Sequence, residues 1–234
     1  MTARTLRWLS LVDVLGIPLL VQWAVWREGG APHWVFYAIP VWLVGSFLLH
    51  RDTPKTLGMR ADTFGAATRE AAVVQGALLV VILIIGLARR ASLTLPPHYH
   101  LFRSLIEYFA FCVVQQVAIN SMLMNRMLEL FGVAPDDRGR PLAGRAFAVT
   151  NESCIAPAAV ISGVIFGLLH WPNPLLVPIT IAGGIAMTWL FARQRNILPL
   201  AVGHAVLGML VAWAFPLSWH HNMRVGPRFY KPYR

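Results

Sequence analysis

Charged residues are scarce in this sequence. Only 13% of its 234 residues are Asp, Glu, Lys or Arg, whereas 57% are hydrophobic and the mean hydropathy is +0.58. A soluble domain carries about 25% charged residues, so the composition argues against a water-soluble protein. Because the charges that do occur cluster between long apolar runs, we expect a polytopic membrane protein with one helical domain.

Cysteines are few, and no linker or signal-peptide cleavage site is recognisable in the sequence. The two cysteines, Cys112 and Cys154, lie in apolar surroundings and are too few for a disulfide framework. No low-complexity linker or solenoid repeat interrupts the chain. The N-terminal stretch is basic and then apolar, but the apolar part is long, contains Asp13 and is followed by no A-x-A cleavage site. We therefore expect an uncleaved first span rather than a signal peptide.

Apolar runs of about 20 residues, the length that crosses the hydrocarbon core of a bilayer, recur along the chain. They predict an all-α bundle of about seven transmembrane spans, with six or eight as alternatives. The expected spans are roughly 6–26, 33–50, 71–88, 103–124, 155–170, 174–192 and 197–215. We divide the chain into a two-span N-terminal segment (1–54), a membrane core (55–215) and a basic polar tail (216–234).

Positive charge exceeds negative charge. The formal net charge is +10 and the pI is about 10.8, which in a soluble protein would suggest a nucleic-acid partner. Here the Lys and Arg residues lie in short loops beside apolar segments, so we expect membrane lipids as their partners and no nucleic acid. With the N-terminus inside, 12 of the 20 Lys and Arg fall on inside segments. This bias favours a cytoplasmic N-terminus, and the Arg-, Ala- and Trp-rich composition suits a bacterial inner membrane.

A few polar side chains interrupt the predicted spans. The stretch FCVVQQVAIN holds Gln115, Gln116 and Asn120, and two later spans hold His170 and His204. Unpaired polar groups in hydrocarbon cost several kcal/mol, so such residues turn inward and often mark a site. Gln116 and Asn120 are one turn apart and share a helix face. Gln115 is rotated by about 100° from Gln116, so the two glutamines cannot point the same way.

Taken singly, each of these residues has a structural interpretation. The amides could form interhelical hydrogen bonds worth about 1 kcal/mol each. His170 could anchor a helix end at the membrane interface, and His204 could be a core histidine with partners for both ring nitrogens. Two histidines and an amide cluster on three spans could also meet in one polar cavity, although spacing alone names no reaction.

Several motifs in the second half of the sequence recur in a fixed order. They are Phe166 with His170 (FxxxH), Gly183–Gly184, Arg193 with Asn196–Pro199 (RxxNIxP) and His204. The earlier stretch KTLGMR, from Lys55 to Arg60, agrees with a further motif of the same set. Together these residues resemble the CPBP family of intramembrane proteases, which comprises CAAX-prenyl-proteases and bacteriocin-processing (Abi) proteins. The resemblance covers roughly residues 55–215.

This chain departs from the family pattern in two places. The family's EExxxR motif corresponds here to QQVAIN, so Gln115 and Gln116 replace two glutamates and Asn120 replaces an arginine. Gly208 stands where the family has asparagine. The resemblance implies that the first glutamate activates water, that one histidine helps to hold it, and that the second histidine and the asparagine stabilise the oxyanion. An amide cannot accept a proton at neutral pH, and general-base help is typically worth about 10²–10⁴-fold.

The resemblance implies a membrane-embedded endopeptidase with a histidine-lined water site, acting on a peptide or membrane-protein substrate. The candidate catalytic residues are His170, His204, Gln115, Gln116 and Asn120. The loss of the glutamates leaves open a catalytically inactive pseudoprotease that binds peptides as an immunity or scaffold protein, and polar mid-membrane groups also allow a transporter or channel. We expect no cofactor, because two histidines and an amide are a poor zinc set compared with His₂Glu.

Overall fold

The computed structural model of this chain describes residues 2–27, 31–89, 98–133 and 149–231. Within these ranges the backbone forms helices and turns and no strand, so the expectation of an all-α fold is confirmed. The α-helices are α1 (Ala3–Trp26), α2 (His33–Leu49), α3 (Phe64–Ala88), α4 (His98–Gln116), α5 (Asn125–Leu130), α7 (Val149–Leu168), α8 (Leu176–Gln194), α9 (Leu198–Ala214) and α10 (Leu217–His220). A π-helix, η1 (Val117–Met124), joins α4 to α5, and two 3₁₀ turns, η2 (His221–Met223) and η3 (Gly226–Tyr230), follow α10.

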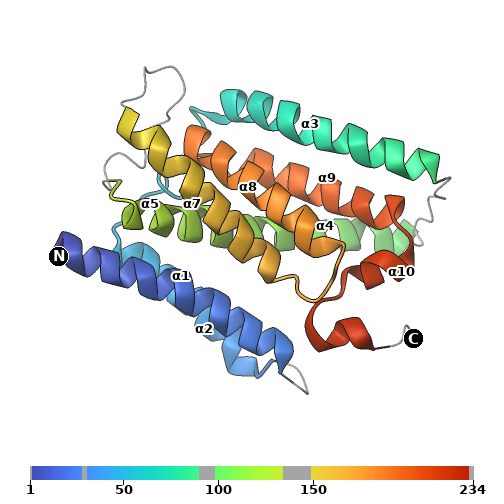
Figure 1. The fold of residues 1–234 in the computed structure, drawn as a ribbon, viewed down its shortest axis with the longest axis horizontal. Coiled ribbons are helices and arrows are strands. Elements are labelled where there is room, and N and C mark those ends of the chain that lie inside the picture. Colours follow the sequence, from blue (N-terminus) through green and yellow to red (C-terminus); the bar gives the residue numbers. More distant parts are fainter. Residues whose placement is uncertain (1, 28–30, 90–97, 134–148, 232–234) are drawn as a thin grey trace.

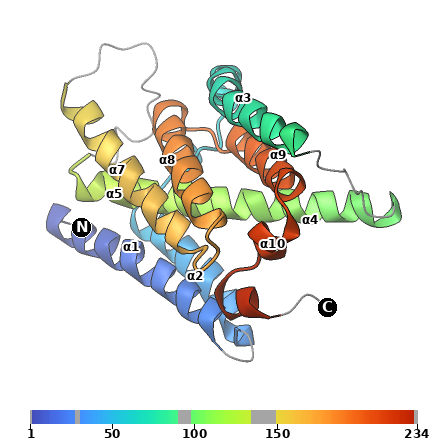
Figure 2. The same cartoon turned by 45° about the vertical axis from the view of Figure 1, so that its right-hand side comes forward.

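One long helix organises the bundle. The continuous run of α4, η1 and α5 crosses the molecule, with the pair α1 and α2 on one side and α3 and α9 on the other (Figure 1). The turned view in Figure 2 keeps this order and shows α7 beside α8. Helix α9 packs against both α3 and α4, and η1 contacts α7 and α8. Side chains from α4, η1, α8 and α9 can therefore meet in the interior.

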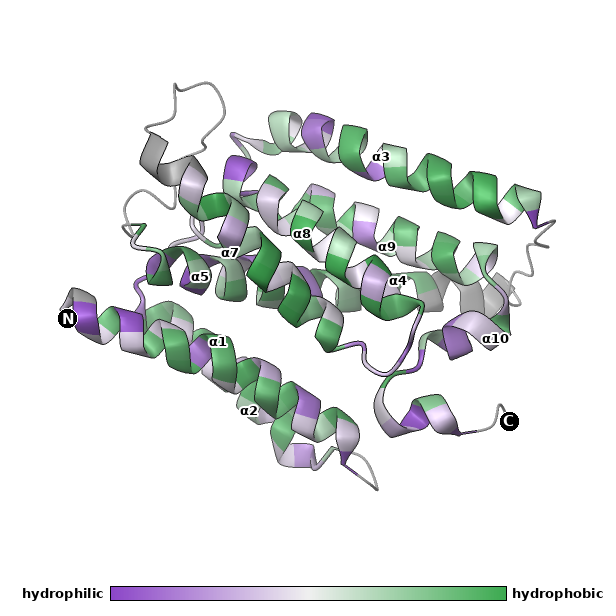
Figure 3. Ribbon diagram, viewed as in Figure 1, coloured by the Kyte–Doolittle hydropathy of each residue, from purple (hydrophilic) through white to green (hydrophobic). Residues whose placement is uncertain are grey.

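Several helices are suited to a lipid environment. Four are long and apolar enough to cross a membrane: Arg4–Trp26, Phe64–Ala88, Leu105–Leu130 and Leu176–Gln194. Three shorter apolar helices are His33–Leu49, Ser153–Leu168 and Leu198–Ala214. Figure 3 shows hydrophobic residues along most of α3, α7 and α9, and large apolar side chains such as Leu48 and Val73 are exposed. The apolar helices indicate an integral membrane protein, while the count of seven spans stays a prediction.

The closest helix pairing, between α7 and α8, depends on glycines. A Cβ atom at Gly163 would lie 2.5 Å from the backbone nitrogen of Ile185, and one at Gly167 would lie 3.0 Å from that of Ile181. Neither backbone nitrogen can move aside, so only glycine permits this approach. The G-x-x-x-G spacing in the sequence thus marks a real helix–helix contact, and it fixes α7 and the turn after it against α8.

The span predicted to end near residue 124 instead continues as helix to Leu130, because its charges are neutralised inside the protein. Arg126 is fully buried. Its guanidinium donates a hydrogen bond to Asp52 and lies 3.2 Å from Glu129 Oε1 and 3.4 Å from Asp13 Oδ2. Two of these carboxylates come from distant parts of the chain, which is why the local sequence predicted a loop here.

A larger polar group surrounds this arginine. We call Asp13, His50, Asp52, Arg126 and Glu129 the Arg126 cluster. The His50 ring lies between two carboxylates, with Nδ1 2.6 Å from Glu129 and Nε2 3.4 Å from Asp13, at ion-pair distance but out of line for hydrogen bonds. A buried charge persists only when it is paired. The cluster therefore ties α1 and α2 to α5.

The turn after α7 is held by the C-terminal segment. Asn173 is fully buried, and its Nδ2 donates to the backbone oxygens of His220 (2.9 Å) and Arg224 (3.1 Å). Its Oδ1 accepts from the backbone N–H groups of Leu175 and Leu176 at the start of α8. Burial lowers the pKa of the His220 imidazole below its ordinary value, which favours its neutral form.

Candidate active site

The two amides predicted to share a face do so at a change of helix geometry. The backbone passes from α to π geometry directly after Gln116, and Asn120 lies within η1. Both side chains are fully buried, and Asn120 Nδ2 donates a hydrogen bond to Gln116 Oε1. Single π-turns inside α-helices are frequent at functional sites. The helix here presents an amide pair toward α8 and α9.

The orientation of the Gln116 amide follows from its neighbours. Its Nε2 lies 3.1 Å from Met187 Sδ on α8 and 3.0 Å from His204 Nδ1 on α9. A thioether can only accept a hydrogen bond, so the Gln116 atom beside Met187 is the NH₂ group. The carbonyl oxygen then faces Asn120, which donates to it. The amide is therefore engaged at both of its ends.

This orientation assigns the tautomer of His204. Because the Gln116 NH₂ donates, His204 Nδ1 must accept. The proton of the neutral imidazole therefore sits on Nε2. Gln116 thus holds His204 as a hydrogen-bond donor through Nε2.

His170 has the opposite tautomer. Its Nδ1 lies 3.0 Å from the backbone carbonyl oxygen of Phe166, one turn earlier. A carbonyl can only accept, so Nδ1 carries the proton and Nε2 keeps its lone pair. The rings of His170 and His204 both meet the Phe166 ring edge-on, with centroids 4.8 Å and 6.1 Å away. One phenyl ring therefore holds a histidine that can accept a proton beside a histidine that can donate a hydrogen bond.

The remaining predicted residues differ in their bonding. Asn120 Oδ1 is buried and has no hydrogen-bond partner within the described part of the chain. A buried acceptor of this kind can accept from a bound water or a substrate N–H. Gln115 is half-buried, and its side chain makes no hydrogen bond with the described residues. It lies outside the Gln116–His204 contact because it is turned away by about 100° on the helix.

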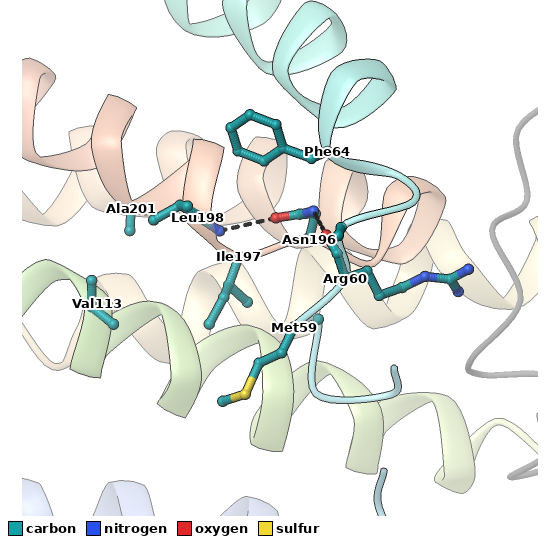
Figure 4. Close-up of a pocket in the computed structure, with 10 residues that line it drawn as sticks. Met59, Arg60, Phe64, Val113, Asn196, Ile197, Leu198 and Ala201 are labelled. Atoms are coloured by element: carbon teal, nitrogen blue, oxygen red, sulfur yellow. Dashed lines mark hydrogen bonds between the residues drawn. The ribbon is translucent and has the colours of Figure 1, made fainter. Parts of the chain in front are cut away.

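A cavity of about 510 Å³ lies close to these groups, between the segment that precedes α3, helix α4 and the start of α9 (Figure 4). Its lining is mostly apolar: Gly58, Met59, Ala61, Phe64, Val113, Ile197, Leu198 and Ala201, with Arg60 and Asn196 as polar members. Val113 and Ala201 lie three residues before Gln116 and His204 on their helices. The inner wall of the cavity is thus about one helical turn from the polar site.

The cavity is built where two sequence motifs meet. Asn196 Nδ2 donates to the backbone oxygen of Arg60 (2.6 Å), and its Oδ1 accepts from Leu198 N–H (3.3 Å), as Figure 4 shows. The N–H of Ile197 donates to the oxygen of Gly58 (3.1 Å). The RxxNIxP turn is therefore pinned to the KTLGMR loop. At the exposed side of this loop the Arg60 guanidinium lowers the pKa of the neighbouring Asp62 carboxyl, which keeps it ionised.

No metal-binding group is evident among the residues that the structure describes: no three His, Cys, Asp or Glu side chains gather there in a way that could hold an ion. The two cysteines of the chain are free. The expectation that the protein uses no cofactor stays a prediction.

Sequence reasoning missed Met187 and the π-helix. Methionine in an apolar helix carries no sequence signal for a polar contact, yet Met187 fixes the Gln116 amide. The residues of η1, VAINSMLM, look like an ordinary apolar helix in the sequence. The amide pair one turn apart was the only available hint, since both side chains had to find partners.

One family of known proteins matches most of this chain. The family model described as "Type II CAAX prenyl endopeptidase Rce1-like" matches residues 57–210. Those residues include every candidate site residue, the RxxNIxP turn, and the KTLGMR loop from Leu57 onward. Comparison with curated proteins and with solved structures finds no match.

Proposed function

Because the chain belongs to the Type II CAAX prenyl endopeptidase Rce1-like family, we propose that it is a membrane-embedded endopeptidase whose general base is a histidine. The observation that carries the proposal is the pair of opposite tautomers at His170 and His204, whose rings both contact Phe166. Peptide hydrolysis needs one group that takes a proton from water and one that stabilises the oxyanion. The two histidines offer one of each.

His170 is the general base in this proposal. Its Nε2 lone pair is free of the backbone hydrogen bond that occupies Nδ1. An imidazole nitrogen with a free lone pair is a base, whereas an amide such as Gln116 has no basicity at neutral pH. The role that the family pattern gives to a glutamate thus passes to an imidazole.

His204 is the oxyanion donor. Gln116 accepts nothing from it and donates to its Nδ1, which keeps the proton on Nε2. Asn120 in turn orients Gln116 by donating to its carbonyl oxygen. Gln116 and Asn120 are therefore positioning residues, and together they make a neutral version of the network that a glutamate and an arginine would form.

The proposed reaction conserves atoms and charge. Water gives a proton to His170 Nε2 while its oxygen bonds to the scissile carbonyl carbon, and the negative charge that forms on the carbonyl oxygen accepts the hydrogen bond of His204 Nε2–H. Collapse of this intermediate breaks the C–N bond. His170 then passes its proton to the leaving nitrogen, so that the products are a carboxylic acid and an amine.

The cavity beside the site supports an apolar peptide segment as the substrate. Its lining is mostly apolar and approaches the Gln116–His204 contact to about one helical turn. An apolar side chain of the substrate, bound there, would bring a neighbouring peptide bond toward the two histidines. Apolar burial would contribute about 25 cal/mol per Å² to such binding.

The proposal is tested by peptide cleavage in liposomes. Purified protein is mixed with a set of synthetic membrane-associated peptides, and products are identified by mass spectrometry. We expect the wild type and the control His33→Ala, an exposed histidine on α2, to cleave at least one peptide, and the double variant His170→Ala/His204→Ala to cleave none. Equal products from the wild type and the double variant, or no product from the wild type, would overturn the proposal.

The replacement of both glutamates favours one alternative, an inactive peptide-binding protein. In that case the same neutral network would only shape the cavity. Photo-crosslinking separates the two: a wild type that captures peptides without cleaving them, at the same sites as the double variant, favours the alternative. Cleavage that depends on the two histidines rules it out.

A further inference from the structure

A tyrosine from α4 reaches α9 at a glycine. A Cβ atom built at Gly208 would lie 1.9 Å from the Tyr108 hydroxyl oxygen and 3.0 Å from Cζ of the same ring. The hydroxyl thus occupies the space of a side chain at position 208. Only glycine allows this contact, since any larger residue there would push the phenol away.

Gly208 lies one turn after His204 on the same face of α9. Residues four apart on a helix have Cβ positions about 5–6 Å apart, and each Cα–Cβ bond is tilted toward the N-terminus of the helix. The Tyr108 hydroxyl, which takes the Cβ position of Gly208, therefore lies over the turn that begins at His204. The hydroxyl therefore lies on the same side of α9 as the His204 imidazole.

Tyr108 also shares a face of α4 with the amide that binds His204. Tyr108, Cys112 and Gln116 are spaced by four residues, so they form one stripe toward α9. Gln116 is bonded to His204, and Tyr108 meets Gly208. Helices α4 and α9 thus meet at two places, at the Gln116–His204 hydrogen bond and where Tyr108 approaches Gly208.

The hydroxyl proton is not committed to a strong acceptor. The Tyr108 hydroxyl hydrogen-bonds to the Cys112 sulfur, and sulfur is a weak acceptor. A half-buried phenol between two apolar helices would be better replaced by phenylalanine if packing were its only role, because burying a hydroxyl with a poor partner costs free energy. A stronger acceptor, such as an oxyanion, can therefore compete with the Cys112 sulfur for the hydroxyl proton.

We propose that the Tyr108 hydroxyl is a second donor to the oxyanion, acting beside His204 Nε2–H. The inference rests on the proposed endopeptidase function and adds a catalytic residue to it. The charge that develops on the scissile carbonyl oxygen then accepts two hydrogen bonds, one from the Tyr108 hydroxyl and one from His204 Nε2–H. Tyr108 fills the role from α4, because Gly208 itself carries no side chain.

The first experiment compares Tyr108→Phe with Tyr37→Phe, a matched change at an exposed tyrosine on α2. Removing one oxyanion donor typically lowers kcat by about 10²–10³-fold. We expect Tyr108→Phe to show this loss with an unchanged KM and an unchanged thermal midpoint, and Tyr37→Phe to match the wild type. A fall in kcat that tracks a lower midpoint or a raised KM would assign Tyr108 to packing and overturn the inference.

The second experiment moves the donor to the other helix. Tyr108→Ala removes the hydroxyl and opens space, and Tyr108→Ala/Gly208→Asn places a carboxamide in that space. We expect the kcat of the double variant to be at least tenfold higher than that of Tyr108→Ala. A double variant that elutes as folded protein and remains as slow as Tyr108→Ala would count against the inference.

These outcomes separate the inference from the proposed function. If His170→Ala/His204→Ala abolishes cleavage while Tyr108→Phe retains the wild-type rate, the endopeptidase stands and the role of Tyr108 fails. If the wild type cleaves no peptide, both fail together.

Discussion

Replacing His170 with alanine is expected to lower kcat for peptide cleavage by about 10²–10⁴-fold, the usual contribution of a general base. The reason is that His170 Nε2 is the proton acceptor that its backbone hydrogen bond to Phe166 leaves free. Because we propose that the substrate binds in the apolar cavity, away from His170, we expect KM to change little. Steady-state kinetics on a peptide identified by mass spectrometry would measure both constants.

Two controls accompany this prediction, a variant of another histidine and the addition of imidazole. His33→Ala should behave as the wild type, because His33 is exposed at the start of α2. Imidazole added to His170→Ala should restore part of the rate, since it supplies the missing base. Retention of more than about a tenth of the wild-type kcat by His170→Ala would show that another group takes the proton.

Arg126→Met should destabilise the protein by about 3–5 kcal/mol, the typical cost of removing one partner from a buried ion pair. Methionine keeps much of the side-chain volume but leaves three carboxylates of the Arg126 cluster without their guanidinium. The loss should appear in the free energy of unfolding measured by denaturant titration in mixed micelles. The α1–α2 pair should also become more accessible to protease, because the cluster ties it to α5.

The matched control is Arg193→Met. Arg193 pairs with Glu70 at 3.3 Å, but both side chains are about 30% exposed, and such exposed pairs contribute about 0–1 kcal/mol. The two variants remove the same charge, so a difference between them reports burial. Similar small losses in both would mean that the Arg126 cluster does not hold the N-terminal helices.

Most of the helices could be predicted from the sequence because lipid-length apolar runs leave few other structures. The first two predicted spans agree closely with α1 and α2. The predicted end of the α4–η1–α5 run was wrong. Arg126 and Glu129 look like loop residues in the sequence, because their partners Asp13 and Asp52 are distant in the chain. The π geometry of η1 likewise has no local sequence signal. Long-range partners decide where the run ends.

In the candidate site, the contacts between residues four apart on one helix could be predicted from the sequence. The four-residue spacings of Gln116 with Asn120 and of Phe166 with His170 each correspond to a contact in the structure. The approach of Tyr108 to Gly208 could not be predicted, because it depends on how α4 and α9 cross. The tautomers of the two histidines could not be predicted either. They follow from the contact of Gln116 with the Met187 sulfur and from that of His170 with the Phe166 carbonyl oxygen.

The most direct test of the account is the proton position on the two site histidines. Solid-state ¹⁵N NMR of histidine-labelled protein in lipid, with single-histidine variants for assignment, distinguishes protonated from unprotonated ring nitrogens. The hydrogen bonds of the two histidines predict a protonated Nδ1 and an unprotonated Nε2 at His170, and the reverse at His204. The same tautomer at both positions would contradict the assignment of one histidine as base and the other as oxyanion donor.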